Sequence, residues 1–146
     1  MVAPLLAGID ADLLTPPLNV IRLSLHPRGL ARRTATFHEW RVHILERLRR
    51  EVELTADQRL ADLLTEVRAY PIPGGQPPRK PSDEFAGVAI PFQLNTEDGD
   101  LLSFLSTTTV FGTPVDVTLS ELTLETFFPA DAATAQALRA MAAGLD

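Results

Sequence analysis

Residues 101–111 read Leu-Leu-Ser-Phe-Leu-Ser-Thr-Thr-Thr-Val-Phe, and this stretch decides the fold. At the period of two that a β-strand imposes, apolar side chains fall on both faces. Leu102, Phe104 and Val110 share one face, and Leu101, Leu105 and Phe111 share the other. A strand with this pattern is typical of one covered on both sides. Its hydroxyl groups have two interpretations: a polar lining in an apolar ligand pocket, or a solvent-facing side whose threonines favour the strand conformation.

Further strands are predicted on both sides of this stretch. Glu97-Asp98-Gly99 is a hairpin signal, and it joins the stretch to a preceding strand over Val88–Leu94, in which Pro91 indicates an edge or a bulge. After Gly112-Thr113-Pro114, alternating apolar residues predict strands over Val115–Leu119 and Leu122–Phe128. The two series are out of phase, so a bulge or turn is expected at Ser120-Glu121. The sequence therefore predicts an antiparallel meander of three to four strands.

Helices are predicted before and after the meander. The spacing of apolar residues predicts helices over Phe37–Leu54 and Ala56–Ala69, opened by capping boxes at Thr36/Glu39 and at Thr55/Gln58. Asp131 is predicted to cap a last helix over Ala132–Ala143. At the start of the chain we expect a helical lead-in over Pro4–Pro17 and a first strand over Leu18–Leu25.

These elements predict an α+β fold, in which helices pack on one face of an antiparallel sheet. This is the general plan of PAS-like sensor domains. The Pro/Gly-rich stretch 71–87 is expected to be a surface loop, with a lid over a pocket as the alternative. At 146 residues the whole chain is expected to form a single domain.

Composition excludes several classes of function. There is no cysteine, which removes disulfides and thiolate chemistry. Residues 1–80 carry 12 basic against 9 acidic side chains, residues 81–146 carry 1 against 10, and the sum is the net charge of −6. This balance argues against nucleic-acid binding by this piece alone. We expect no signal peptide, because Met1–Ala11 has neither a basic region nor a sufficiently long apolar run, and no stretch of the sequence is long enough to span a bilayer.

The sequence carries no recognisable catalytic or metal-binding motif. His38 and His43 are five residues apart and do not converge on one helix face, and His26 precedes a proline. Acidic residues of the second half, Glu125 among them, are scattered and expected to be mostly solvated. The helix pair at 37–69 lacks the basic second helix of a DNA-reading helix-turn-helix. We therefore predict no catalytic residue, no metal ligand and no cofactor.

Five segments of the chain resemble the ligand-binding domain of MmyB-like transcription regulators, in particular the branch common in actinobacteria. They are Pro16–Pro27, Glu39–Arg41 with Leu45–Arg50, Phe104–Thr118 and Glu121–Leu138. The resemblance covers about residues 5–140. It implies a PAS-like domain that follows an N-terminal helix-turn-helix of the xenobiotic-response-element (XRE) type in a cytoplasmic regulator, with a pocket for a fatty-acid-like molecule. The DNA-binding half is absent from this chain, so we expect either a fragment or a stand-alone sensor that contacts DNA only through the missing domain.

The leading hypothesis is a pocket between the 37–54 helix and the sheet. Apolar side chains would hold an acyl chain, hydroxyls would orient its head, and Arg47 or Arg22 would neutralise a carboxylate. Plain core packing is the alternative for each residue. The candidate ligand-binding residues are Trp40, Ile44, Arg47, Phe92, Phe104, Thr108 and Phe111. Two other functions stay open: a dimerisation or interaction module that uses the sheet or the alanine-rich last helix, and a small α+β enzyme.

Overall fold

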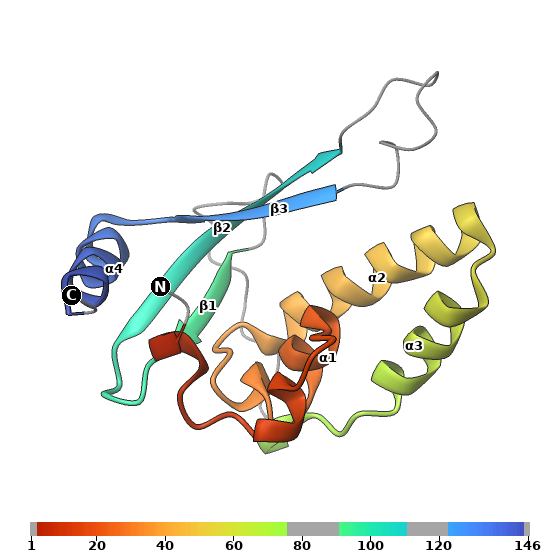
Figure 1. Ribbon diagram of the computed structural model, residues 1–146, viewed down its shortest axis with the longest axis horizontal. Helices are drawn as coiled ribbons and strands as arrows, with labels where there is room; N and C mark the ends of the chain where they lie inside the picture. Colours follow the sequence, from red (N-terminus) through yellow and green to blue (C-terminus); the bar gives the residue numbers. More distant parts are fainter. Residues whose placement is uncertain (1–2, 76–90, 111–122, 145–146) are drawn as a thin grey trace.

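Three antiparallel strands form the centre of the computed structural model, which describes residues 3–75, 91–110 and 123–144 (Figure 1). The strands are β1 (Phe92–Asn95), β2 (Leu101–Val110) and β3 (Thr123–Pro129), in the order β1-β2-β3. Phe92 pairs with Phe104 across the first ladder, and Thr108 pairs with Glu125 across the second. The predicted α+β class and the meander are confirmed. The strand predicted over 115–119, the bulge at Ser120-Glu121 and most of the 71–87 loop lie outside the described residues.

The hairpin between β1 and β2 is the one that the sequence predicts. Gly99 has φ +90°, a left-handed conformation that glycine adopts without a steric penalty. The amide of Thr96 donates to the Asp100 carbonyl at 2.8 Å and closes the turn. Because the turn fixes the register, Leu94 and Leu102 share the face that carries Phe92 and Phe104.

Helices precede and follow the sheet. The short 3₁₀ helices are η1 (Ala3–Leu6), η2 (Ala11–Leu14), η3 (Leu30–Arg32) and η4 (Pro73–Gly75). The α-helices are α1 (Val20–Leu25), α2 (Phe37–Thr55), α3 (Gln58–Arg68) and α4 (Ala132–Ala143). The predicted lead-in over Pro4–Pro17 is therefore two 3₁₀ turns rather than one amphipathic helix.

The strand predicted over Leu18–Leu25 is wrong, because residues 20–25 form α1. Asn19 caps this helix: its side chain accepts a hydrogen bond from the Arg22 amide at 3.0 Å. Leu23, Ser24 and Leu25 are buried in succession, which is incompatible with a half-exposed alternating strand. An apolar run of this length fits either period, and only its tertiary surroundings decide between them.

Both helices that were predicted from capping boxes exist, but neither Thr36 nor Thr55 forms the predicted capping hydrogen bond. The Thr36 hydroxyl donates to the Pro91 carbonyl at 3.1 Å and does not cap α2. It thus ties the start of α2 to the segment that enters β1. The cap of α3 is Asp57 rather than Thr55, since the Asp57 carboxylate accepts from the Arg59 amide at 2.8 Å.

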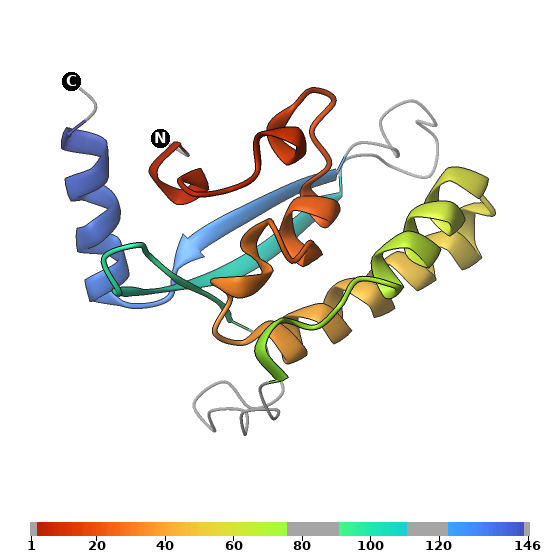
Figure 2. The same cartoon turned by 90° about the horizontal axis from the view of Figure 1, so that it is seen from below.

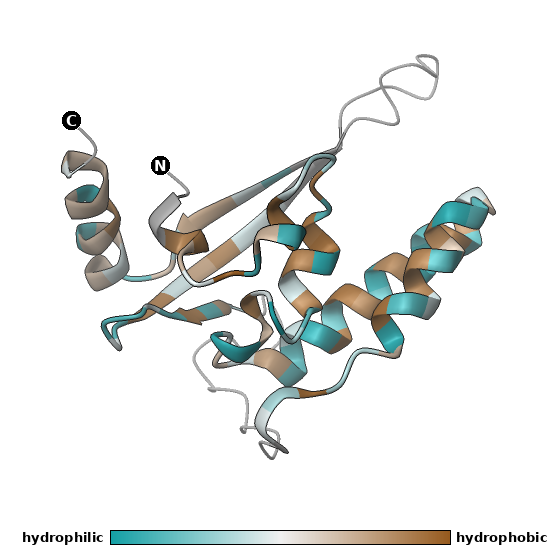
Figure 3. Ribbon diagram, turned by 60° about the horizontal axis from the view of Figure 1, so that its bottom comes forward, coloured by the Kyte–Doolittle hydropathy of each residue, from teal (hydrophilic) through white to brown (hydrophobic). Residues whose placement is uncertain are grey.

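The hydrophobic core lies between the helices and one face of the sheet, here called the inner face. Helices α1, α2 and α3 lie on this side, and α4 stands at one end of the sheet (Figures 1 and 2). The brown, apolar stripe of α2 and the apolar side of α3 are visible in Figure 3. Core residues include Phe37, Trp40, Ile44 and Leu48 from α2, Leu63, Leu64 and Val67 from α3, and Phe92, Leu94, Leu102 and Phe104 from the sheet. Burying one such side chain contributes about 1.5–3 kcal/mol.

The last helix begins at the predicted cap and is anchored to β2. Asp131 accepts a hydrogen bond from the Thr134 amide at 2.7 Å. The fully buried Thr134 hydroxyl in turn accepts from the Ser103 amide at 2.9 Å. Thr134 therefore continues the hydrogen bonding of β2 beyond the end of β3.

Candidate functional site

Four aromatic rings from α2 and all three strands gather on the inner face. The ring centroid of Trp40 lies 4.7 Å from that of Phe92 and 6.3 Å from that of Phe127. Phe104 lies 6.2 Å from Phe92 and 6.5 Å from Phe127, the latter pair edge to face. Tilted and edge-to-face pairs at these distances are favourable beyond the area that they bury. The four residues form a continuous aromatic wall.

This wall has one exposed edge. Trp40, Phe92 and Phe104 are almost fully buried, whereas Phe127 keeps 41% of its surface exposed. Phe127 nevertheless contacts the other three rings. Phe127 is thus the part of the aromatic wall that solvent reaches.

A charged pair lies beside the aromatic wall. The guanidinium of Arg47 lies 3.1 Å from a Glu125 carboxylate oxygen, and the two side chains are 31% and 27% exposed. Glu125 precedes Phe127 by two residues on β3, so both residues face α2. Arg47 follows Trp40 by seven residues, which is two helical turns along the same side. The contact between α2 and the sheet is thus aromatic at Trp40 and charged at Arg47.

Two buried polar atoms at this site have no hydrogen-bond partner among the described residues. They are Nε1 of Trp40 and Oε1 of Glu125. Leaving such a group unpaired costs about 1–3 kcal/mol. A bound molecule that accepts from the indole or donates to the carboxylate would recover part of this cost.

The structure brings together most of the residues predicted for the site. Trp40, Ile44, Phe92 and Phe104 are buried in one cluster, and Arg47 lies at its charged end. Thr108 is opposite Glu125 in the strand register, and Phe111 lies outside the described residues.

Sequence reasoning missed Glu125 and Phe127. Most of the scattered carboxylates of the second half are expected to be solvated, and Glu125 is an exception, since it pairs with Arg47 across the two layers. The signal available was the alternation of Glu125 and Phe127 on one strand face, but it could be placed only once the register with β2 was known.

Arg22, the other arginine predicted to neutralise a ligand carboxylate, is instead paired with Glu66. Its guanidinium donates to both carboxylate oxygens of Glu66, with the shortest contact at 2.8 Å. The Tyr70 hydroxyl donates to the same carboxylate. These bonds, first of all those from Arg22, lower the pKa of Glu66, while burial and the bond to Glu66 raise the pKa of Tyr70 to about 12. Arg22 therefore joins α1 to α3.

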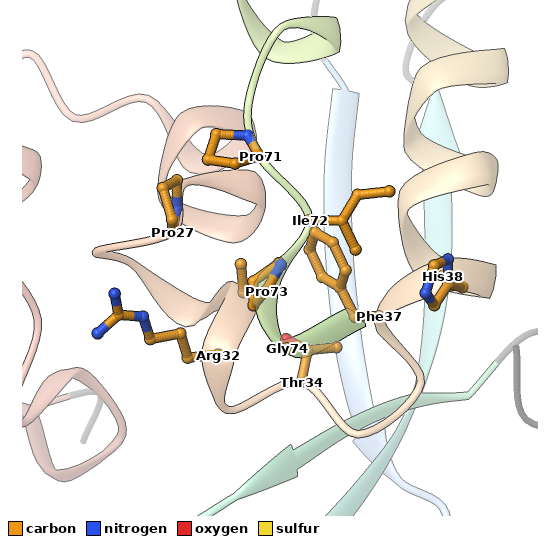
Figure 4. A pocket seen from close by; sticks show the side chains of 10 residues that line it. Pro27, Arg32, Thr34, Phe37, His38, Pro71, Ile72, Pro73 and Gly74 are labelled. Carbon is orange, nitrogen blue, oxygen red and sulfur yellow. The ribbon is translucent and has the colours of Figure 1, made fainter. Parts of the chain in front are cut away.

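A cavity of about 440 Å³ lies apart from these residues (Figure 4). It opens where the turn after α1, η3, the start of α2 and the segment after α3 meet. None of the predicted site residues that the structure describes lines it. Its walls are Pro27, Ala31, Arg32, Thr34, Phe37, His38, Pro71, Ile72, Pro73 and Gly74.

Within the described ranges, no group of three or more His, Asp or Glu side chains is placed to hold a metal ion. No helix in this part of the chain has the length and apolarity needed to cross a membrane.

Comparison with known proteins gives one family. A family model described as "MmyB-like transcription regulator ligand binding domain" matches residues 1–141, nearly the whole chain. No curated protein matches significantly. No solved structure matches significantly either.

Proposed function

Because the chain belongs to the family of MmyB-like transcription regulator ligand binding domains, we propose that it senses an apolar small molecule with one polar end, such as a fatty acid, between α2 and the inner face of the sheet. The observation that carries this proposal is the joint placement of the aromatic wall and the Arg47–Glu125 pair. DNA would be contacted through another domain of the regulator, such as a helix-turn-helix of the XRE type, in the cytoplasm.

The aromatic wall supports an acyl chain as the apolar part of the ligand. Trp40, Phe92, Phe104 and Phe127 present carbon surface without a formal charge, and Ile44 extends it along α2. Each methylene that leaves water for such a surface contributes about 0.8 kcal/mol. A chain entering over the exposed edge of Phe127 would run toward the buried rings.

The charged pair supports a carboxylate as the polar end. Glu125 places a carboxylate on Arg47 at 3.1 Å, the arrangement that a fatty-acid head would need. Because the pair is partly exposed to water, exchanging one carboxylate for another costs little. The exchange would release β3 from α2 and so transmit ligand binding to the packing between the two layers.

The single tryptophan provides a direct test, since Trp40 lies in the proposed site. Delipidated protein is titrated with laurate and with dodecanol while Trp40 fluorescence is recorded. Saturable changes with both ligands are expected, because both bury the same chain. Native mass spectrometry of the complexes gives the stoichiometry, expected to be one to one.

Three variants distinguish recognition of the ligand's carboxylate from recognition of its acyl chain. Arg47→Gln should weaken laurate binding about tenfold or more, as for the loss of a charge-assisted hydrogen bond, and leave dodecanol unchanged. Glu125→Gln should tighten laurate binding, since Arg47 then has no competing carboxylate. Arg50→Gln, an exposed arginine on the same helix, is the matched control. A protein that binds neither compound would overturn the proposal, and equal laurate affinity in all variants would remove Arg47 from it.

A further inference from the structure

The cavity of about 440 Å³ at the start of α2 is independent of the site proposed above. Its volume is in the range of pockets that hold small molecules. Four separate segments of the chain form it, and no residue of the aromatic wall or of the Arg47–Glu125 pair lines it. Whatever binds there is recognised by different side chains.

Part of the cavity wall is apolar and flat. Figure 4 shows the ring of Phe37 beside Ile72 and Pro73, with Pro27 and Pro71 above them. Phe37 is buried and forms a fixed wall, whereas Ile72 keeps 43% of its surface exposed. An exposed isoleucine beside an aromatic ring is a surface that a second flat apolar group can cover.

Among the described residues that line the cavity, Arg32 carries a formal charge and none is a carboxylate. Arg32 and His38 stand on opposite sides of the cavity (Figure 4). Arg32 is exposed, and it forms no ion pair with any carboxylate of the described residues. The Thr34 hydroxyl donates to the Leu30 carbonyl at 2.9 Å and is already satisfied. Arg32 is therefore the positively charged group that the described lining offers, and it is complementary to an anion.

We propose that this cavity binds a small aromatic carboxylate, with the aromatic ring against Phe37, Ile72 and Pro73 and the carboxylate at Arg32. A guanidinium pairs with a carboxylate in a planar, two-pronged geometry. Inorganic phosphate fits less well, because it has no apolar part to lie against Phe37, Ile72 and Pro73. Among the described lining residues, a cation finds no carboxylate. Occupancy would connect the segment after α3 to η3 and α2, since the ligand contacts all three.

Phenylacetate and its neutral amide, phenylacetamide, are the probes. The full chain is ¹⁵N-labelled and titrated with each up to millimolar concentrations, and the amide signals of Phe37, Ile72 and Gly74 are followed by NMR. Phenylacetate should shift these signals saturably. Phenylacetamide should bind at least about tenfold more weakly, because it cannot form the ion pair.

Variants assign the binding to Arg32 and Ile72. Arg32→Gln should weaken phenylacetate about tenfold, and Ile72→Ser should weaken both probes; both side chains are exposed, so the fold is preserved. Arg139→Gln, which removes an exposed arginine from α4, is the matched control. Absence of saturable shifts at the cavity, or equal affinity of the acid and its amide, would overturn the proposal. Trp40 lies outside the cavity, so the laurate experiment can fail without affecting this one.

Discussion

Gly29 occupies a buried position in the turn between α1 and η3, where the backbone of α1 comes very close. Its amide donates to the His26 carbonyl at 2.9 Å. A Cβ atom at this position would collide with the carbonyl oxygen of Leu23, which is backbone and cannot move aside. The absence of a side chain is thus what allows the chain to turn here.

Gly29→Ala is therefore expected to destabilise the protein by about 1–3 kcal/mol, the usual cost of overpacking a tight site. Urea unfolding followed by circular dichroism measures the difference. Gly144→Ala is the control, because a Cβ there would lie 3.7 Å from the Ala140 carbonyl oxygen, an ordinary contact. Equal stability of the two variants would contradict the steric explanation.

At the level of elements, α1 is attached to α3 by polar contacts as well as by burial. Arg22 of α1 binds Glu66 of α3, and Tyr70 donates to the same carboxylate. The His26 ring stacks edge-on against Tyr70 with centroids 4.9 Å apart. Since the side chains of Arg22 and Glu66 are 46% and 39% exposed, the ion pair contributes at most about 1 kcal/mol.

The contribution of the Arg22–Glu66 pair to stability should decrease as the pH falls. The pKa of folded Glu66 is lowered from its ordinary value of 4.5, first by the hydrogen bonds from Arg22. The stabilisation is therefore present above pH 4.5 and lost as pH falls through the lowered pKa of the folded state. Glu66→Gln should lower the free energy of unfolding by about 0.5–1 kcal/mol at neutral pH, and its deficit should shrink as the solution is acidified.

Urea unfolding at several pH values from 7 downward tests this expectation. Glu51→Gln, which removes an exposed carboxylate of α2 without an ion pair among the described residues, is the control. A constant stability deficit of Glu66→Gln over the whole pH range would show that the carboxylate charge is not what joins the helices.

At alkaline pH, Tyr70 should have a similar effect. Its raised pKa of about 12 implies stability that is lost as pH rises from 10 toward 12.

For the molecule as a whole, Arg33 connects three distant parts of the chain. Its guanidinium donates to the carbonyls of Leu5 and Ala7 at 3.0 and 2.9 Å and to that of Asn95 at 2.8 Å. The Asn95 amide donates back to the Arg33 carbonyl. One side chain thus holds the N-terminal turn, the segment before α2 and the end of β1 together.

Arg33→Gln is expected to destabilise the protein by about 1.5–3 kcal/mol, because hydrogen bonds from a charged donor to partly buried carbonyls are lost. Hydrogen exchange should accelerate first at the amide of Ile9, which follows the released turn. Arg32→Gln, at the neighbouring exposed position, should leave the stability unchanged. Equal effects of the two substitutions would contradict a connecting role for Arg33.

Local signals in the sequence predicted much of the fold and part of the candidate site. The α2 stripe, the Gly99 hairpin and the Asp131 cap depend on neighbours close in the chain, and the structure has all three. The same reasoning failed for Leu18–Leu25, where a short apolar run fits two periodicities. It failed again at Thr36, because the partner of its hydroxyl, Pro91, is 55 residues away.

The sequence by itself determined the helix faces and the hairpin, because these follow from residue spacing over short windows. It also indicated the family, through the resemblance of whole segments to known proteins. Only the tertiary structure decided which side chains meet across the layers. The pairing of Glu125 with Arg47 spans 78 residues and requires the register of β3 on β2. The cavity at Arg32 and Ile72 likewise exists only because four segments converge there. Such contacts are set by packing and strand register, which no local pattern encodes.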